Sequence, residues 1–259
     1  MNYRTRLFGI VFLAGFIGVL STLLIDLNAV IKVLPVATAT TLPMAPWLIK
    51  LVGLIQPTII VAVATLVGVL LAQKVFLSAP AFEALARRES FIPALRPQIV
   101  SGVAGGVLGA AAVVSSWIVA RSVLPSEFVA RAEQFNRVLP VPTRLLYGGV
   151  TEEILLRWGL LTLFVWAGWR FFQHREGEPR RAYVIAAILV SSVVFGIGHL
   201  PIAVVLGSLT LPIGLYIVAA NSTFGVIAGY LYWRKGLEAA IIAHMFTHVG
   251  IVSASYFLG

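Results

Sequence analysis

Ionisable side chains are few in the long apolar segments of this sequence, and those present fall into three groups with helical spacing. They are Glu152, Glu153, Arg157, His199, His244 and His248. A charged side chain at the centre of a membrane helix costs roughly 2.5–3.5 kcal/mol on insertion scales, so residues of this kind mark functional sites by default. Carboxylates and imidazoles together could activate water, bind a metal ion or relay protons.

The first group contains two adjacent glutamates and one arginine. Glu153 and Arg157 are separated by four positions, so they stack on one face of a helix in the favourable order. Glu152 is turned by about 100° from Glu153 and has no basic partner on its own helix. A carboxylate without a cation beside it is the better candidate for a base that takes a proton from water. The alternative is a buried ion pair with a spare glutamate that helps helices to pack.

The last group, His244 and His248, presents two imidazoles on one side of an apolar helix. The pair could bind a metal ion such as Zn²⁺, donate hydrogen bonds to a developing oxyanion, or relay protons in a transporter. Zinc proteases of the H-E-x-x-H class need glutamate at the second position, where this chain has Met245. That class is excluded, whereas metal binding as such stays open.

The middle group pairs Phe195 with His199 on one helical face, and Pro201 is expected to end this helix. Gly196 and Gly198 would let a neighbouring helix approach closely. A lone histidine near a helix end is commonly an interfacial or capped core residue. His199 therefore gains a functional meaning only together with the other two groups.

In this order, and each on an apolar segment, the three groups resemble the motifs of the CAAX protease and bacteriocin-processing (CPBP) family. These are intramembrane glutamate proteases that include the Ras-converting CAAX endopeptidase. The resemblance covers residues 145–250. It implies an endopeptidase that hydrolyses a peptide bond in a membrane-associated peptide or protein substrate, with or without a lipid anchor. No cofactor is implied, and a divalent metal at the histidines is the alternative.

The resemblance also implies a role for each motif residue. Glu152 would activate a water molecule, His199 would hold that water or share its proton, and His244 would stabilise the oxyanion. The family pattern has Asn or Asp where this chain has His248, and a neutral imidazole can still donate one hydrogen bond there. The residues that would support the site are Glu153, Arg157 and Phe195.

Composition indicates a membrane protein. Hydrophobic residues make up 59% of the 259 residues and charged residues 11%, whereas a soluble domain has about 25% charged residues. About 20 apolar residues are needed for each span. We therefore predict an all-α polytopic bundle of about seven or eight helices in a single membrane domain (1–259), with a motif-bearing core (145–250) and three accessory spans (1–120). Spans are expected near 7–31, 47–73, 99–120, 145–169, 183–200, 212–233 and 237–258.

The segments between the spans carry further expectations. Residues 78–97 contain three prolines and are expected to form a loop, and residues 121–144 could form an interfacial helix. The apolar stretch 201–211 is too short to cross and could be a re-entrant turn or half-helix. Asp26 is expected at a span end. Residues 37–39 fit a small-residue cleavage pattern, but they lie too far downstream, so a retained first span is expected.

The basic residues predict the orientation. Of the 19 Lys and Arg residues, twelve fall on the side of the N-terminus, six on the other side, and Arg157 within a span. This asymmetry predicts a cytoplasmic N-terminus, in a bacterial or archaeal cytoplasmic membrane. Because the net charge of +9 comes from short loops, no nucleic-acid partner is expected. The absence of cysteine excludes disulfides and thiolate catalysis.

Two other classes of function fit the same residues. A transporter could use the acidic residues and histidines as a proton or cation path, although many transporters contain inverted repeats and none is evident here. A non-catalytic membrane scaffold or immunity-type protein could retain the motifs for packing alone.

Overall fold

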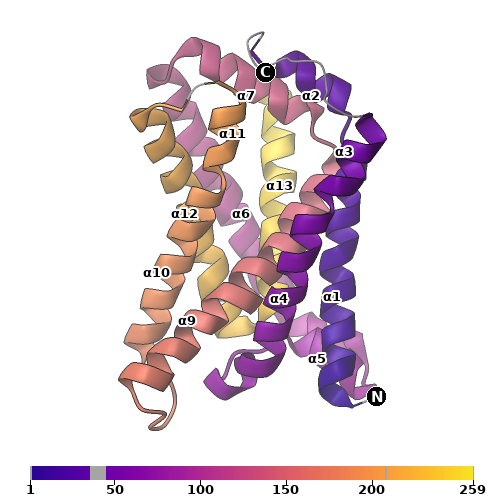
Figure 1. Ribbon diagram of the computed structural model, residues 1–259. Helices are drawn as coiled ribbons and strands as arrows, with labels where there is room; N and C mark the ends of the chain where they lie inside the picture. The colour runs from indigo at the N-terminus through magenta and orange to yellow at the C-terminus, as the bar shows by residue number, and fades with distance from the viewer. Residues whose placement is uncertain (1, 36–44, 208, 259) are drawn as a thin grey trace.

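Figure 1 shows the computed structural model of the protein, which describes residues 2–35, 45–207 and 209–258. The described residues form helices and no strand. Seven of the helical segments in this part of the chain are long and apolar enough to cross a membrane. They are 3–24, 46–75, 91–123, 141–172, 181–205, 211–235 and 237–257. The predicted all-α polytopic bundle is therefore confirmed.

Each span is built from one or more helices. In chain order these are α1 (Tyr3–Ser21) with η1 (Thr22–Leu24); α3 (Pro46–Gly53), α4 (Ile55–Leu71) and η2 (Ala72–Val75); α6 (Phe91–Val123); α8 (Val141–Thr143), η3 (Arg144–Glu152), η4 (Ile154–Leu161), α9 (Thr162–Ala167) and η5 (Gly168–Phe172); α10 (Arg181–Gly198) and α11 (Leu200–Val205); α12 (Leu211–Lys235); and α13 (Leu237–Leu258). Three further helices connect spans, namely α2 (Leu27–Val33), α5 (Pro80–Arg87) and α7 (Ser126–Val138).

The structure corrects the prediction of a loop at residues 78–97. It contains α5 and the first turns of α6, so the third span begins at Phe91 and not near 99. Pro80 lies in the first turn of α5, and Pro93 lies in the first turn of α6, where a helix does not need the backbone N–H. Pro97 lies inside α6. The prolines therefore start helices here and do not break them.

The structure also corrects the predicted end of the fifth span. The helix was expected to end at Pro201, but α11 follows α10 and extends the span to Val205. Pro201 occupies the first turn of α11, where its missing N–H costs nothing. The stretch after His199 thus begins with a short helix, which agrees with the half-helix alternative and not with the re-entrant turn. His199 lies six residues before the end of the span, roughly 9 Å deep in it.

The segment 121–144 contains a helix, as expected. In Figure 1, α7 lies with α2 and α11 at the end of the bundle opposite the N-terminus. Phe128 of α7 packs in a small apolar cluster with Leu206 and Ile213. Arg131 fixes this packing, because its Nη1 donates to the carbonyl of Leu206 over 3.0 Å. Helix α7 therefore covers one end of the bundle; its place at a membrane interface stays a prediction.

Close helix contacts position the fourth span. Thr151 on η3 donates from its hydroxyl to the carbonyl of Gly15 on α1 over 2.7 Å. Trp158, fully buried on η4, donates to the carbonyl of Thr65 on α4 over 3.3 Å. Much of this span has π-helical hydrogen bonding. The fourth span is thus held on two sides by the accessory spans.

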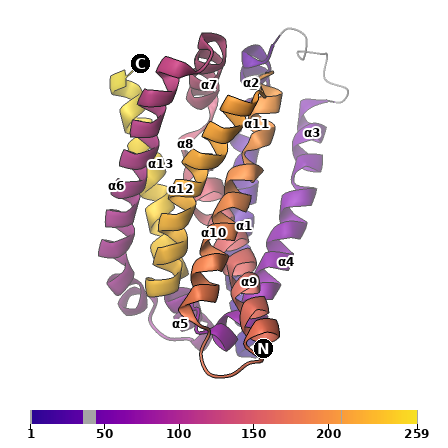
Figure 2. The same cartoon turned by 90° about the vertical axis from the view of Figure 1, so that its left-hand side faces the viewer.

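On the opposite side of the fold, α6 and α13 run side by side (Figure 2). Thr247 on α13 donates to the carbonyl of Gly106 on α6 over 3.1 Å.

Asp26 caps the N-terminus of α2, since its side chain accepts from the Asn28 N–H over 2.9 Å, as suits a residue at a span end. The cleavage pattern at 37–39 lies outside the described residues.

Candidate active site

A buried chain of three charged or polar side chains connects η3 and η4 to α13. Glu153 Oε2 lies 3.1 Å from Arg157 Nε, and Glu153 Oε1 lies 2.8 Å from His244 Nδ1. The exposed fractions are 0% for Glu153, 1% for Arg157 and 4% for His244. Arg157 also donates from Nη2 to the carbonyl of Gly225 over 3.0 Å. Glu153 is therefore held by a hydrogen bond to His244 at one oxygen and by an ion pair with Arg157 at the other, and Oε2 makes no hydrogen bond within the described residues.

The adjacent carboxylate has a different environment. The side chain of Glu152 is 20% exposed, and His244 Nε2 lies 3.9 Å from Glu152 Oε2. This separation is too long for a hydrogen bond but suits a bridging water or substrate atom. Two neighbouring glutamates thus differ, because one is held by partners and the other is available.

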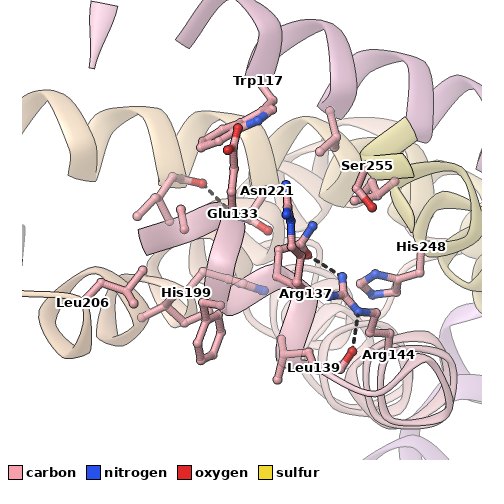
Figure 3. Close-up of a pocket in the computed structure, with 18 of the residues that line it drawn as sticks. Trp117, Glu133, Arg137, Leu139, Arg144, His199, Leu206, Asn221, His248 and Ser255 are labelled. Carbon is pink, nitrogen blue, oxygen red and sulfur yellow. Dashed lines mark hydrogen bonds between the residues drawn. The ribbon is translucent and has the colours of Figure 1, made fainter. Parts of the chain in front are cut away.

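Glu152 faces a cavity of about 530 Å³ in the half of the bundle covered by α7. His199 and His248 line the same cavity (Figure 3). Apolar walls come from α6, α7, α11, α12 and α13, and include Val113, Trp117, Phe128, Leu206, Ile217 and Ile251. Three of the four residues that the sequence singled out as catalytic therefore share one cavity, and His244 lies directly behind Glu152.

His199 is oriented by the backbone of its own helix. Its Nδ1 lies 2.9 Å from the carbonyl of Phe195, so Nδ1 is the donor and Nε2 of the neutral ring is left as an acceptor. Phe195 also packs edge-on against His199, with ring centroids 4.7 Å apart. Gly196 permits close approach of α12, because a Cβ there would lie 2.5 Å from the carbonyl of Val218. The same expectation was wrong for Gly198, which has no neighbour within 4 Å of a Cβ position.

The two histidines of α13 stack on each other. Their ring centroids are 4.8 Å apart and the rings are inclined by 13°. His244 is engaged by Glu153, whereas the buried Nδ1 of His248 has no hydrogen-bond partner among the described residues. In the same part of the chain, no group of three or more His, Cys, Asp or Glu side chains could hold a metal ion.

Gly148 makes room for His248, and this gives a test of the packing. A Cβ at position 148 would collide with His248 Nε2. We expect Gly148→Ala to push the imidazole out of position and to lower any activity of the site at least tenfold, a loss measured as kcat/KM. Gly198→Ala is the matched control, since its Cβ meets open space. Equal activity of both variants would show that the position of His248 does not matter.

The cavity is also lined by polar residues that were not singled out from the sequence, among them Arg144, Tyr147 and Asn221. Asn221 is a polar residue in the middle of a span and could have been noticed on that ground. Arg144 was counted as a loop residue, because its position at the start of η3 makes it look like an ordinary charge at a span end.

Comparison with known proteins agrees with this geometry. A family model described as type II CAAX prenyl endopeptidase Rce1-like matches residues 134–250. No curated protein and no solved structure matches the chain. The matched segment extends from α7 into α13 and contains all three motif groups. Residues 134–250 of this integral membrane protein therefore form a domain of the type II CAAX prenyl endopeptidase Rce1-like family of proteases.

Proposed function

We propose that the protein is an intramembrane endopeptidase in which Glu152 activates the water that attacks the peptide bond. The observation that carries the proposal is the contrast between the two glutamates. Glu153 is fully buried between Arg157 and His244, whereas Glu152 is 20% exposed and faces a cavity large enough for water and a peptide. A base must reach both the water and the substrate, and Glu152 is the carboxylate that meets this condition.

In the proposed reaction, Glu152 takes one proton from a water molecule as the water oxygen attacks the substrate carbonyl carbon. The acceptor nitrogen Nε2 of His199 fixes the second hydrogen of the same water. The tetrahedral intermediate carries a negative oxygen, which the N–H of His248 can stabilise from the cavity wall. The proton held by Glu152 then passes to the amine as the C–N bond breaks.

His244 has a connecting position in this scheme. If the Nδ1 proton is donated to Glu153, its Nε2 faces Glu152 as an acceptor at 3.9 Å. The proton collected by Glu152 can therefore rest on His244, reached through a bridging water, while the tetrahedral intermediate exists. The protonated ring, held by Glu153, donates to the oxyanion, and the same proton returns through Glu152 to the amine as the C–N bond breaks. This agrees with the oxyanion role expected from the family resemblance and needs no second proton.

The substrate we propose is a peptide that is associated with the membrane through a lipid chain. The walls of the cavity are mostly apolar, and they lie within the bundle beside a polar row formed by Glu152, His199 and His248. The apolar walls suit a lipid chain, and the polar row suits a peptide bond. The prenyl endopeptidase description of the family supports the same pairing.

The direct test uses the purified protein in detergent with a farnesylated peptide that ends in a CAAX sequence. Mass spectrometry should detect a shortened peptide carrying a new carboxylate in the presence of the unaltered protein. Heat-denatured protein and Glu152→Gln should give none. A product that forms equally with Glu152→Gln would sink the proposed role of Glu152.

We further propose that hydrolysis needs no metal ion. His244 Nδ1 faces Glu153, and the described residues offer no group of three or more metal ligands. Incubation with 5 mM EDTA, a concentration well above that of any bound metal, is therefore expected to leave the rate within roughly twofold of its starting value. Loss of activity that returns on adding Zn²⁺ would instead establish the metal alternative at the two histidines.

A further inference from the structure

Arg144 is a buried cation in the wall of the same cavity. It begins η3, eight residues before Glu152, and its side chain is only 9% exposed. It lines the cavity together with Glu152 and His248. The side chains of Arg144 and His248 lie next to each other in Figure 3. None of the steps proposed above uses this guanidinium.

The hydrogen bonds of Arg144 fix its position at the end of α7. Its Nε donates to the carbonyl of Leu139 over 3.3 Å, and its Nη1 donates to Asn136 Oδ1 over 2.5 Å. Its Nη2 donates to the carbonyl of Asn136. These contacts use three of the five guanidinium N–H groups, so one N–H on each terminal nitrogen remains. The guanidinium is therefore held rigidly with two donors to spare.

All three acceptors are neutral oxygens, which distinguishes Arg144 from the other arginines with side-chain partners. Ion pairs in the described part of the chain join Arg87 to Glu83, Arg131 to Glu127 and Arg157 to Glu153, and none of them includes Arg144. The carbonyls at the end of α7 supply partial charges only. Burial of a cation is costly when no carboxylate compensates it. A substrate group with a negative charge would complete the site.

We propose that Arg144 binds the C-terminal carboxylate of the peptide substrate, an inference that rests on the proposed function. Arg144, Gly148 and Glu152 follow one another at intervals of four residues, so they lie along one wall of the cavity. The imidazole of His248 packs against Gly148, so a peptide that joins the other two would run past His248. Eight residues of helix span at most roughly 12 Å, and an extended peptide covers about 3.3–3.6 Å per residue. A carboxylate at Arg144 therefore places the bond near Glu152 about three residues from the C-terminus.

The test compares one farnesylated CAAX peptide in two forms, the free acid and the C-terminal amide. The unaltered protein is expected to cleave the acid with a kcat/KM roughly 10- to 100-fold above that of the amide, because a charge-assisted hydrogen bond is lost in the amide. In Arg144→Gln the acid should fall to the level of the amide, while the amide is unchanged. Arg144→Lys should keep part of the preference, since lysine supplies the charge but not the paired donors.

Arg137→Gln is the matched control, because Arg137 is an exposed arginine at the same cavity. It should keep the ratio between acid and amide. If the unaltered protein cleaves both forms equally, the proposal is wrong, even though cleavage still depends on Glu152. If cleavage does not depend on Glu152, the proposed function itself is wrong. The two failures are thus separable.

Should Arg144→Gln fail to fold, binding to the inactive Glu152→Gln variant decides the question. The acid is expected to bind this variant roughly 10- to 100-fold more tightly than the amide. Equal binding of both forms overturns the proposal. So does inhibition by phosphatidylglycerol vesicles that depends on Arg144 without any preference for the acid, because a lipid phosphate would then occupy the guanidinium.

Discussion

Glu152→Gln is expected to lower peptidase activity by roughly 10²–10⁴-fold, the usual contribution of a general base, without unfolding the protein. Glutamine has almost the same shape but cannot accept the proton of the attacking water. The Glu152 side chain is 20% exposed, and its Oε2 lies 3.9 Å from His244 Nε2. Its replacement therefore leaves no buried partner without a hydrogen bond, and the melting temperature should change by less than about 2 °C.

The measurement must separate chemistry from binding. We expect Glu152→Gln to lose kcat while the dissociation constant for the farnesylated peptide stays within about threefold of the original value. An unchanged kcat would remove Glu152 from the mechanism. A fall in melting temperature as large as the one expected below for Glu153 would show instead that Glu152 supports the fold.

The sequence alone was sufficient to predict the membrane fold and to recognise the family resemblance. Low charge and long apolar runs required a helical bundle, because every backbone polar group in a bilayer must be bonded within the chain. The i, i+4 spacing of Glu153 and Arg157 was also sufficient to place the two on one face, and the structure has them 3.1 Å apart. These features depend on local sequence, which a single chain displays directly.

Features that depend on partners distant in sequence were not accessible in the same way. The contact of His244 with Glu153 joins residues 91 positions apart, and no local pattern predicts which of the two glutamates the imidazole meets. The positions of the prolines led to wrong helix boundaries for a different reason. Pro80 and Pro201 were taken as signs of loops or ends, but each lies in the first turn of a new helix, where proline is well tolerated. This error placed His199 too near the end of its span.

Arg144 shows a third limit of prediction from the sequence. Its charge was visible, but a cation near the start of a span is normally turned toward water and lipid head groups. Only the packing of α7 over the bundle end shows that the guanidinium is turned inward and bonded to Asn136 and Leu139. Its lack of a carboxylate partner depends on all the surrounding helices at once. Such a property appears only when the tertiary contacts are known.

Glu153→Ala is expected to have the second large effect, on stability and not primarily on chemistry. It removes the carboxylate that holds Arg157 and His244, whose exposed fractions are 1% and 4%. Loss of one member of a buried ion pair typically costs about 3–5 kcal/mol, because the remaining charge is left without a partner. For a chain of this size, this corresponds to a fall in melting temperature of roughly 6–20 °C. Thermal unfolding in detergent, followed by circular dichroism, measures the effect.

A surface pair supplies the matched control for this prediction. Glu127 pairs with Arg131 at the same i, i+4 spacing, but the Glu127 side chain is 72% exposed, so Glu127→Ala should cost less than about 1 kcal/mol. Arg157→Met in the Glu153→Ala background should restore part of the lost stability, since it removes the orphaned cation. If the double variant is instead as unstable as the sum of the two single ones, the two residues do not act as a pair. The stability of the site would then depend on packing around Phe195 and Gly225, where the Arg157 side chain ends.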